Sequence, residues 1–375
     1  MKEIILIIQI AMIFIGSIVG AGVCSGRELN QFFATYGIAG FFGLILCGLL
    51  YIVFSKMIIL ITARFKVCSY NEFVDLVCPK FVARFINVIL TLFLLSSTSI
   101  ILAGSGSIIS QYFHVSKWIG VGVMIGCSSI FLLRNTEGLF EVNSIVVPAL
   151  FITMTAIFFS YISQNPSSFS YAYVLLMPRQ KTNLIVSTLV YVSFNILTII
   201  GVVVPLTHEI RKSKEIIKGI VVGSSILTII SIYITFLMLT NPFHASLYEV
   251  PLLGLAMEMN KVLQFGMLGI MWLEMFSSQV SNVYSLSYFM RNKFKVPYNK
   301  GIFLAVIIAT PFSMVGFAKL VEFLYPLYGV LSLVFLFYCT LFFLKMNRTS
   351  DVKQLAHNQA SNEQSANTYE VLNTK

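Results

Sequence analysis

Four glycines and a charged pair lie inside one apolar stretch near the start of the chain. Residues 15–33 read IGSIVGAGVCSGRELNQFF and contain Gly16, Gly20, Gly22 and Gly26, followed by Arg27 and Glu28. A glycine weakens a helix interior by roughly 1 kcal/mol relative to alanine, so this cluster indicates either a close helix crossing or an interrupted helix. Charges at this depth indicate a water-filled cavity and favour the interruption. The packing interpretation stays open, because Gly16, Gly20 and Ala21 also fit the small-residue pattern of helix crossings.

A carboxylate stands near the middle of a later apolar segment, where a charge is costly. This residue, Glu274, precedes Ser277 and Ser278 by one helical turn and is expected to share their helix face. A carboxyl group in that position can carry a coupling proton or help to bind a cation. It can equally be a neutral or paired structural group, and the sequence leaves both interpretations open.

The composition is that of an integral membrane protein. The chain has 375 residues, of which 57% are hydrophobic and 11% charged, and its mean hydropathy is +0.87. Its six cysteines have no CxxC spacing and no histidine cluster nearby, so neither a disulfide framework nor a metal site is indicated. No P-loop, GxSxG or HExxH motif is present in the sequence, and we therefore expect no enzymatic activity.

Windows of about 20 residues, the length that crosses roughly 30 Å of hydrocarbon, define about ten apolar spans. The spans are Ile4–Ala34, Ile38–Ala63, Phe81–Phe113, Trp118–Leu133, Leu139–Ile162, Leu184–Thr207, Ile216–Leu239, Val262–Met290, Ile302–Gly316 and Leu320–Leu344. The apolar stretch Pro251–Met259 is too short to cross, and it is predicted to be a helix across the outer mouth. The sequence therefore predicts an all-α polytopic membrane protein.

The basic residues are concentrated in the loops on one side of these spans. They include the clusters at 211–218 and 291–300, whereas the loops of the other side hold few Lys or Arg. Because such loops face the cytoplasm, both termini are predicted to be cytoplasmic in a multi-pass protein of the bacterial plasma membrane. The same asymmetry explains the net charge of +10, because basic loops are expected at the cytoplasmic surface of the lipid bilayer. We therefore expect no nucleic-acid partner.

The polar loop after the fifth span divides the chain into two halves. We expect a first five-helix repeat at 1–162, an extracellular connecting loop at 163–182, a second repeat at 183–345 and a disordered cytoplasmic tail at 346–375. An odd number of spans in each half inverts the second half relative to the first. If the repeats are equivalent, the sixth span should be interrupted as the first is, so that two discontinuous helices form one site near mid-membrane.

The sixth span contains residues that suit such an interruption. Ser193 and Asn195 lie near its middle, and Gly201 and Pro205 follow. Proline removes a backbone donor, and Ser or Asn side chains can bond freed peptide groups. A proline kink in an ordinary packed helix explains the same residues, and this alternative also stays open.

Two stretches carry a family resemblance. GSIVGAG, at residues 16–22, resembles the unwound segment of the first helix in LeuT-fold transporters of the amino acid–polyamine–organocation (APC) superfamily. PLTHEIRKSKEIIK, at 205–218, resembles the end of their sixth helix, and VGAGVCSGRELNQFF with VPLTHEI resembles the YkvI-type bacterial membrane proteins of that superfamily. The resemblance covers residues 1 to about 345. It implies a LeuT-like fold of about ten transmembrane helices, as a five-plus-five inverted repeat with discontinuous first and sixth helices.

The resemblance also implies a substrate site at the two interruptions. Exposed peptide groups would bind the carboxylate of an amino acid, since the ends of half-helices carry partial charge. The implied substrate-binding residues are Gly16, Ser17, Gly20, Ala21, Gly22, Tyr191, Ser193, Phe194, Asn195, Ser281 and Asn282. Their lining is apolar, aromatic and small, which favours a neutral, rather hydrophobic substrate. No organic cofactor is implied.

Ion-binding and gating residues follow from the same resemblance. Ser277 and Ser278 resemble the hydroxyl pair that completes a sodium site with first-helix carbonyls, here those of Gly16 and Val19, and Glu274 is placed beside them. Serines in membrane helices also bond their own preceding turn, which is the structural alternative. Arg27 and Glu322 correspond to an extracellular gate, with Glu28 as an equally available partner for the arginine.

These features predict a secondary active transporter of a small neutral, hydrophobic amino acid, coupled to sodium or protons by alternating access. The alternative is a ligand-sensing receptor subunit with the same fold, because the membrane subunits of spore germinant receptors resemble this superfamily. Such a receptor would bind an amino acid without net transport. An unbroken first or sixth helix would remove the peptide groups on which the predicted site depends.

Overall fold

The computed structural model describes residues 2–134, 139–166 and 181–373, and every regular element within these ranges is a helix. The first span is divided into α1 (Lys2–Ile18), α2 (Ala21–Ser25) and α3 (Arg27–Phe32). The other long helices are α4 (Ala39–Phe65), α6 (Lys80–Phe113), α7 (Lys117–Arg134), α8 (Leu139–Gln164), α10 (Leu184–Ile210), α11 (Ser213–Thr240), α14 (Lys261–Phe294), α15 (Tyr298–Ser313) and α16 (Phe317–Asn373). The short helices η1 (Ala34–Tyr36), α5 (Tyr70–Val77), α12 (Pro242–Leu247) and α13 (Pro251–Met257) connect them. Each predicted span thus coincides with a helix or, for the first, with a series of helices.

The surface of the helical body is suited to hydrocarbon. Among the described residues, six helices are long and apolar enough to cross a membrane: Ala39–Phe65, Lys80–Phe113, Val146–Gln164, Leu184–Ile210, Ser213–Thr240 and Phe317–Met346. Large side chains such as Ile152, Val262 and Phe323 are 66%, 81% and 69% exposed, which is unfavourable in water. The chain is therefore a multi-pass membrane protein.

The helices of the two halves pack in matching pairs. α1 packs on α8 and α11, while α10 packs on α16 and α4. In the same way α6 packs on α7 and α16, while α14 packs on α15 and α8. Exchanging α1, α4, α6, α7 and α8 for α10, α11, α14, α15 and α16 maps each of these contacts onto another, as inverted repeats require.

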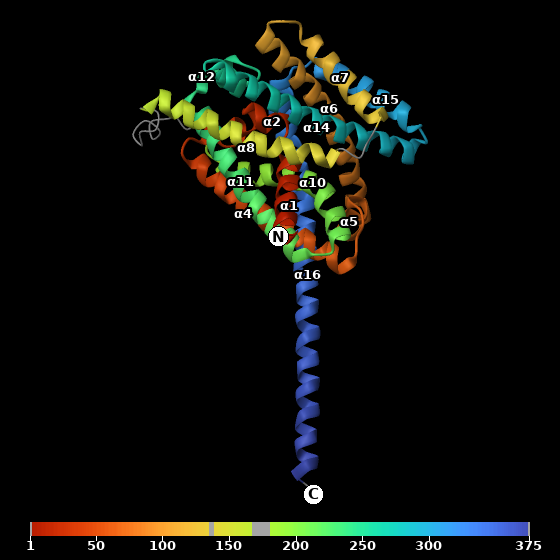
Figure 1. Cartoon of the computed structure of the whole chain (residues 1–375). Coiled ribbons are helices and arrows are strands. Elements are labelled where there is room, and N and C mark those ends of the chain that lie inside the picture. Colours follow the sequence, from red (N-terminus) through yellow and green to blue (C-terminus); the bar gives the residue numbers. More distant parts are fainter. Residues whose placement is uncertain (1, 135–138, 167–180, 374–375) are drawn as a thin grey trace.

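The short connecting helices follow the same relation. α5 joins the second and third long helices of the first half, and α12 and α13 join those of the second. α12 lies near the top of Figure 1 and α5 in its lower half, as expected for inverted halves. The predicted short helix at Pro251–Met259 is confirmed as α13. Between the halves, α8 ends at Gln164 and α10 begins at Leu184, and residues 167–180 of the predicted loop lie outside the described residues.

The first span is interrupted at its glycines, as predicted. The α1 ladder ends when the Val19 N–H donates to the Ile15 carbonyl at 2.8 Å, and Gly20 is extended (φ −143°, ψ −166°). A second irregularity separates α2 from α3 at Gly26, whose φ of +81° is left-handed. A Cβ there would lie 2.9 Å from the Met238 Sδ, so both conformation and space require glycine.

The sixth span is not interrupted, and here the structure corrects the prediction. α10 runs without a break from Leu184 to Ile210, through Pro205. The Ser193 Oγ donates to the Val190 carbonyl at 2.9 Å, and the Asn195 Nδ2 donates to the Tyr191 carbonyl at 3.1 Å. These side chains bond the preceding turn, a pattern that continuous helices accommodate, and Pro205 costs the helix one backbone hydrogen bond.

The predicted disordered tail differs from the structure as well. α16 continues as one helix from Phe317 to Asn373, and its last part projects away from the helical body in Figure 1. Residues 351–373 contain more Asn than any other residue and have little helix propensity of their own, so the helix there continues one already formed inside the body, which avoids the cost of nucleation.

Candidate functional site

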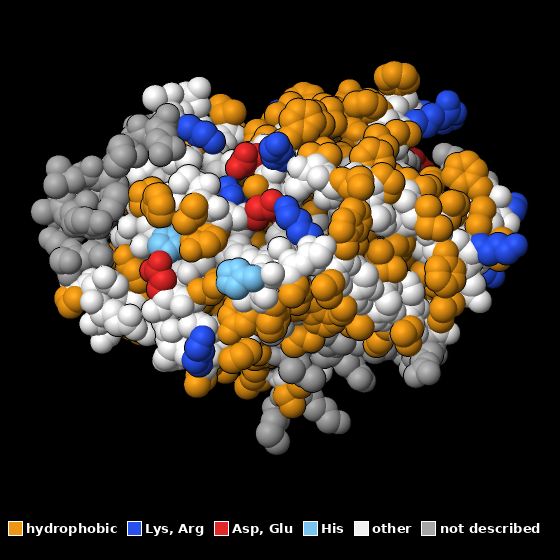
Figure 2. All heavy atoms as spheres, turned by 90° about the horizontal axis from the view of Figure 1, so that it is seen from above, with side chains coloured by type: hydrophobic (Ala, Val, Ile, Leu, Met, Phe, Trp, Pro, Cys, Tyr) orange, Lys and Arg blue, Asp and Glu red, His pale blue; other side chains and the backbone are white. Residues whose placement is uncertain are grey.

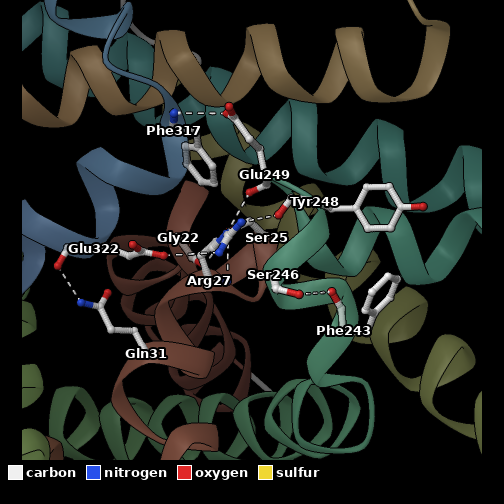
Figure 3. A network of polar contacts seen from close by, with 10 residues as sticks. All are labelled: Gly22, Ser25, Arg27, Gln31, Phe243, Ser246, Tyr248, Glu249, Phe317 and Glu322. Atoms are coloured by element: carbon white, nitrogen blue, oxygen red, sulfur yellow. Dashed lines mark hydrogen bonds and ion pairs between the residues drawn. The ribbon is translucent and has the colours of Figure 1, made fainter.

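Arg27, at the start of α3, lies at the centre of a polar network at the end of the body where α12 lies (Figure 3). Its Nη1 is 3.4 Å from the Glu322 Oε1 on α16. Its Nε donates to the Glu249 carbonyl at 3.2 Å, and its Nη2 donates to the Tyr248 carbonyl. The structure thus brings Arg27 and Glu322 together, and Arg27 contacts Glu322 rather than its neighbour Glu28.

Glu249, between α12 and α13, joins three further elements to this network. Its Oε2 accepts from the Ser107 Oγ on α6 at 2.6 Å and from the Phe317 N–H at the start of α16 at 3.3 Å. Its Oε1 is 3.0 Å from the Lys117 Nζ on α7. Burial by itself raises the pKa of the Glu249 carboxyl, but the hydrogen bonds from Ser107 and Lys117 outweigh it and leave the pKa below its ordinary value.

We name the contacts of Arg27, Ser107, Lys117, Glu249 and Glu322 the outer network. Sequence reasoning missed Glu249, and the available signal was an acidic residue directly before the predicted mouth helix. Figure 2 looks onto this end of the molecule and shows acidic and basic side chains gathered among apolar ones. Since the network joins α3 to α6, α7, α16 and the α12–α13 connection, it closes this end of the molecule around Arg27.

Glu28 lies directly inside the outer network and is only 2% exposed. A Cβ at Gly22 would lie 2.3 Å from the Glu28 Oε2, so the missing side chain allows the carboxylate to lie against α2. The carboxylate is hydrogen-bonded to the Tyr191 side chain, whereas its Oε1 has no partner. A buried carboxylate oxygen without a donor is costly and calls for a functional explanation.

An aromatic cluster from three helices lies next to the interruption. The rings of Phe194 on α10 and Tyr325 on α16 stack with centroids 4.7 Å apart. Phe93 on α6 contacts both Phe194 and Tyr328 with centroids 5.5 Å apart. A Cβ at Gly22 would lie 2.6 Å from the Tyr325 ring, which places the cluster against α2.

Glu274 lies on α14, which packs directly on α2, and it is near Cys24 of that helix. Glu274 is 1% exposed, and its Oε2 has no hydrogen-bond partner. Ser277 is buried and Ser278 partly buried on the following turn. This places the predicted hydroxyl pair and Glu274 on the helix next to the interruption, while the sodium site with Gly16 and Val19 stays a prediction.

A polar stripe runs along α14 from Glu274 toward the end of the body opposite the outer network. Burial decreases along it, since Glu274 is buried, Ser278 is partly buried and Ser281 is exposed. Asn282, next to Ser281, donates to the Ser97 Oγ on α6 at 2.8 Å. Hydroxyl and amide groups at this depth favour water over lipid as their surroundings.

Two glycines indicate open space in the same region. A Cβ added to Gly20, at the interruption, or to Gly201, on α10, would meet nothing within 4 Å. Gly201 lies two turns after Phe194 on the same face of α10 and is exposed. Together with the α14 stripe, these positions lie between the interruption and the end of the body opposite the outer network, and we refer to this set of residues as the polar path.

The remaining predicted residues lie apart from this path. Gly16 and Ser17 belong to regular helix in α1, where the Ser17 Oγ donates to the Phe14 carbonyl at 2.7 Å. Ala21 opens α2 and is buried. Ser193 donates to the Gly329 carbonyl of α16 at 2.7 Å, so it serves the packing of α10 on α16.

Comparison with solved structures shows which fold these helices form. MhsT in complex with L-phenylalanine superposes with a TM-score of 0.63 over 88% of both chains, at 13% sequence identity. A Na⁺-coupled sialic acid symporter superposes with a TM-score of 0.57 over 84% of this chain and 74% of its own, at 15% identity. The nucleobase-cation-symport-1 family transporter Mhp1 superposes with a TM-score of 0.56 over 86% of this chain and 74% of its own, at 12% sequence identity. The protein is a LeuT-fold membrane protein.

Comparison with curated sequences shows the family. The chain is 31% identical over 333 residues to the uncharacterized membrane protein YkvI of Bacillus subtilis (strain 168). The aligned region covers 88% of this chain and 93% of YkvI. It is 23% identical over 333 residues to YyaD of the same organism, covering 88% of this chain and 95% of YyaD. No family model matches the sequence. The chain belongs to the family of the membrane protein YkvI.

Proposed function

We propose that this protein is a secondary active transporter of a small neutral, hydrophobic amino acid, coupled to sodium or protons by alternating access. The observation that carries the proposal is the interruption of the first helix at Val19 and Gly20, inside a LeuT-fold body. A helix interrupted there leaves the last carbonyls of α1 and the first N–H groups of α2 without helical partners. Such groups can bind a zwitterion without a formally charged side chain.

The surroundings of the interruption support this substrate class. Phe93, Phe194 and Tyr325 offer apolar ring surface, and Ser96 and Tyr328 offer hydroxyls 2.7 Å apart. An apolar wall with few polar groups favours a ligand with an apolar side chain. The similar protein MhsT was solved with L-phenylalanine, which makes that amino acid the first probe to test.

The continuous α10 removes half of the peptide groups on which the predicted site depended, so the two-interruption site is wrong and the site proposed here rests on the first span alone. The sixth span supplies no free peptide groups near Ser193 and Asn195, so α10 contributes the side chains of Tyr191 and Phe194 instead. The carboxylate and ammonium groups of the substrate are assigned to the interruption between α1 and α2 and to the polar residues of α6 and α14.

The outer network is assigned the role of the extracellular gate. Its contacts join the interrupted first helix to α16 through Arg27 and Glu322, and surface ion pairs of this kind break at small cost. The polar path along α14 leads to the opposite end, which is proposed to face the cytoplasm together with both termini. The conformation described is then closed to the outside.

Counterflow in proteoliposomes tests the function. Vesicles preloaded with unlabelled L-phenylalanine should take up labelled L-phenylalanine, and leucine or alanine should compete. Specific binding without exchange would defeat the transporter and support the ligand-sensing receptor. Neither binding nor exchange with any neutral amino acid would reject the proposed substrate class.

Alanine substitution tests the sodium version of the coupling. Replacing Ser277 and Ser278 with alanine should weaken L-phenylalanine binding mainly in sodium buffer, because the lost hydroxyls would be cation ligands. Equal weakening in sodium-free buffer would count against a cation site. Thr310→Ala on α15 is the control, since its hydroxyl bonds only the preceding turn, to the Val306 carbonyl at 2.8 Å.

A further inference from the structure

The surroundings of Glu28 differ from those of the other acidic residues near the outer end. Glu249 and Glu322 both contact cations, Lys117 and Arg27. Glu28 is buried at 2% exposure with its Oε1 unpartnered, although Arg27 is the next residue in the chain. The Arg27 guanidinium is occupied by carbonyls of the α12–α13 connection and by Glu322.

The titratable groups that face Glu28 are all neutral ones. They are Cys24 on α2, Cys47 and Tyr51 on α4, Tyr191 on α10 and Tyr325 on α16. No Lys, Arg or His of the described residues is among them. An ionised carboxylate in such a place lacks the counter-charge that normally offsets its desolvation.

A small cavity lies beside Tyr191, the hydrogen-bond partner of this carboxyl group, although Glu28 itself does not line it. Its lining comes from α4, α10 and α11 and consists of Leu44, Cys47, Gly48, Tyr51, Tyr191, Leu227, Thr228 and Ser231. Tyr191 is shared between the cavity and the Glu28 hydrogen bond. The cavity volume of about 10 Å³ is at the lower limit for one water molecule, and hydroxyl and thiol groups in its lining offer hydrogen-bond partners for it.

We propose that Glu28 binds the coupling proton, holding it as a neutral carboxyl group between α2, α4 and α10 while the outer network is closed. The step is a reversible transfer in which one carboxylate oxygen takes one proton from water and returns it to water. This inference rests on the proposed transport function, which allows either sodium or protons as the coupling ion. It identifies the proton as that ion.

The position of Glu28 in the fold explains how its proton would be coupled to gating. Glu28 and Arg27 are consecutive in the short helix α3, so a movement of α3 that opens the Arg27 contacts also moves Glu28. The carboxylate also lies against Gly22 at the start of α2, beside the interruption. Protonation of Glu28 removes the cost of enclosing a charge and so favours the closed outer network, whereas deprotonation favours hydration and opening.

Infrared spectroscopy of the full chain in liposomes tests the proton directly, without any substrate. The wild type at neutral pH should show the C=O band of a protonated carboxylic acid, which shifts in D₂O. Glu28→Gln should lose one such band, while the control Glu209→Gln, an exposed residue, should lose only a carboxylate band. Loss of a carboxylate band in Glu28→Gln would overturn the proposal, and a sodium-dependent carboxylate band would assign the site to a cation instead.

A transport measurement tests the coupling. With an imposed pH gradient, the wild type and Glu209→Gln should accumulate labelled L-phenylalanine, whereas Glu28→Gln should exchange it in counterflow but lose accumulation. Accumulation by Glu28→Gln at the wild-type level would overturn the proposal. If the wild type exchanges no amino acid, the proposed function fails while the infrared result still decides whether Glu28 holds a proton. Glu28→Asp serves as the second variant, because it should keep the infrared band if Glu28→Gln fails to fold.

Discussion

The charged residues at the outer end differ in how far water can reach their side chains. Arg27 is 10% exposed in its side chain but contacts Glu322, which is 55% exposed, so this pair can be broken by water from outside. The family resemblance offered Glu322 as the partner of Arg27 but left Glu28 equally available, and the structure shows the contact with Glu322. The sequence was not sufficient for Glu249, whose partners Ser107, Lys117 and Phe317 are distant in sequence and meet only through packing.

Glu249→Gln tests the electrostatic part of the outer network. Glu249 lies in a connection outside the spans, and its pKa is held below the ordinary value. A carboxylate of this kind stabilises the fold above its unfolded pKa, roughly 4.3, and the contribution is lost as the pH falls through the lower folded pKa. We expect the wild type to exceed Glu249→Gln by about 1 kcal/mol at neutral pH, a small value because the side chain is 35% exposed.

Thermal unfolding in detergent at several pH values measures this difference. The gap between wild type and Glu249→Gln should persist from neutral pH down to roughly pH 5, shrink as the pH falls below the unfolded pKa of roughly 4.3, and vanish below the lower folded pKa. Glu258→Gln is the matched control, since Glu258 is 62% exposed and contacts only His244 on this face. A gap that stays constant into strong acid would show that the network owes nothing to the Glu249 charge.

At the level of elements, the glycines of the first span differ in the space around them. Gly20 is at the interruption with open space around its Cα, whereas Gly22 is enclosed by Glu28 and Tyr325. The sequence predicted that the cluster would break the helix, and this is confirmed. The sequence could not show which glycine is the more crowded, because the side chains around Gly22 come from α3 and α16.

Gly22→Ala should therefore damage the protein where Gly20→Ala does not. The new Cβ would lie 2.3 Å from the Glu28 Oε2 and 2.6 Å from the Tyr325 Cε2, so buried side chains must move, at a cost of roughly 1–3 kcal/mol. Gly20→Ala should change stability by less than about 0.5 kcal/mol. Thermal shift of the two purified variants measures the difference, and equal stability would contradict the packing around Gly22.

The continuous sixth helix shows where sequence reasoning reached its limit. Ser193 and Asn195 can either cap a broken helix or bond their own preceding turn, and the choice depends on whether a neighbouring helix offers an acceptor. Here α16 approaches so closely that a Cβ at Gly329 would lie 2.5 Å from the Val190 carbonyl. The Gly329 carbonyl then accepts from Ser193, which favours the unbroken helix.

Ser193→Ala tests this packing role. The substitution removes the interhelical hydrogen bond to the Gly329 carbonyl, which keeps its own helical donor, and should cost about 1 kcal/mol in unfolding free energy. Thr198→Ala is the control, because the Thr198 hydroxyl bonds only the Asn195 carbonyl of its own helix, at 2.7 Å, and should cost less. If both variants unfold at the same temperature, the contact between α10 and α16 does not depend on Ser193.

At the level of the whole molecule, the inverted arrangement was predictable from counting. An odd number of spans per half, separated by one polar loop, leaves little choice but an inverted second half, and the matching helix contacts agree with it. The symmetry holds for packing but not for the interruption, since α1 is broken and α10 is not. Under the proposed function, a single interruption would concentrate opening and closing in the first span, whose helix α3 carries both Arg27 and Glu28.

Cysteine labelling from each side tests this asymmetry in the assembled protein. In a background with the exposed Cys68 and Cys127 replaced by serine, Ser281→Cys should react with an impermeant maleimide from the cytoplasmic side only. Ser107→Cys should resist the reagent from outside until Glu322→Gln is added, because Ser107 is 4% exposed inside the outer network. Phe113→Cys, at the outer end of α6 and 50% exposed, reports that the reagent reaches the outer side. Labelling of Ser281→Cys from outside would reverse the assigned sides. Ready labelling of Ser107→Cys without the second substitution would show that the outer end is not closed.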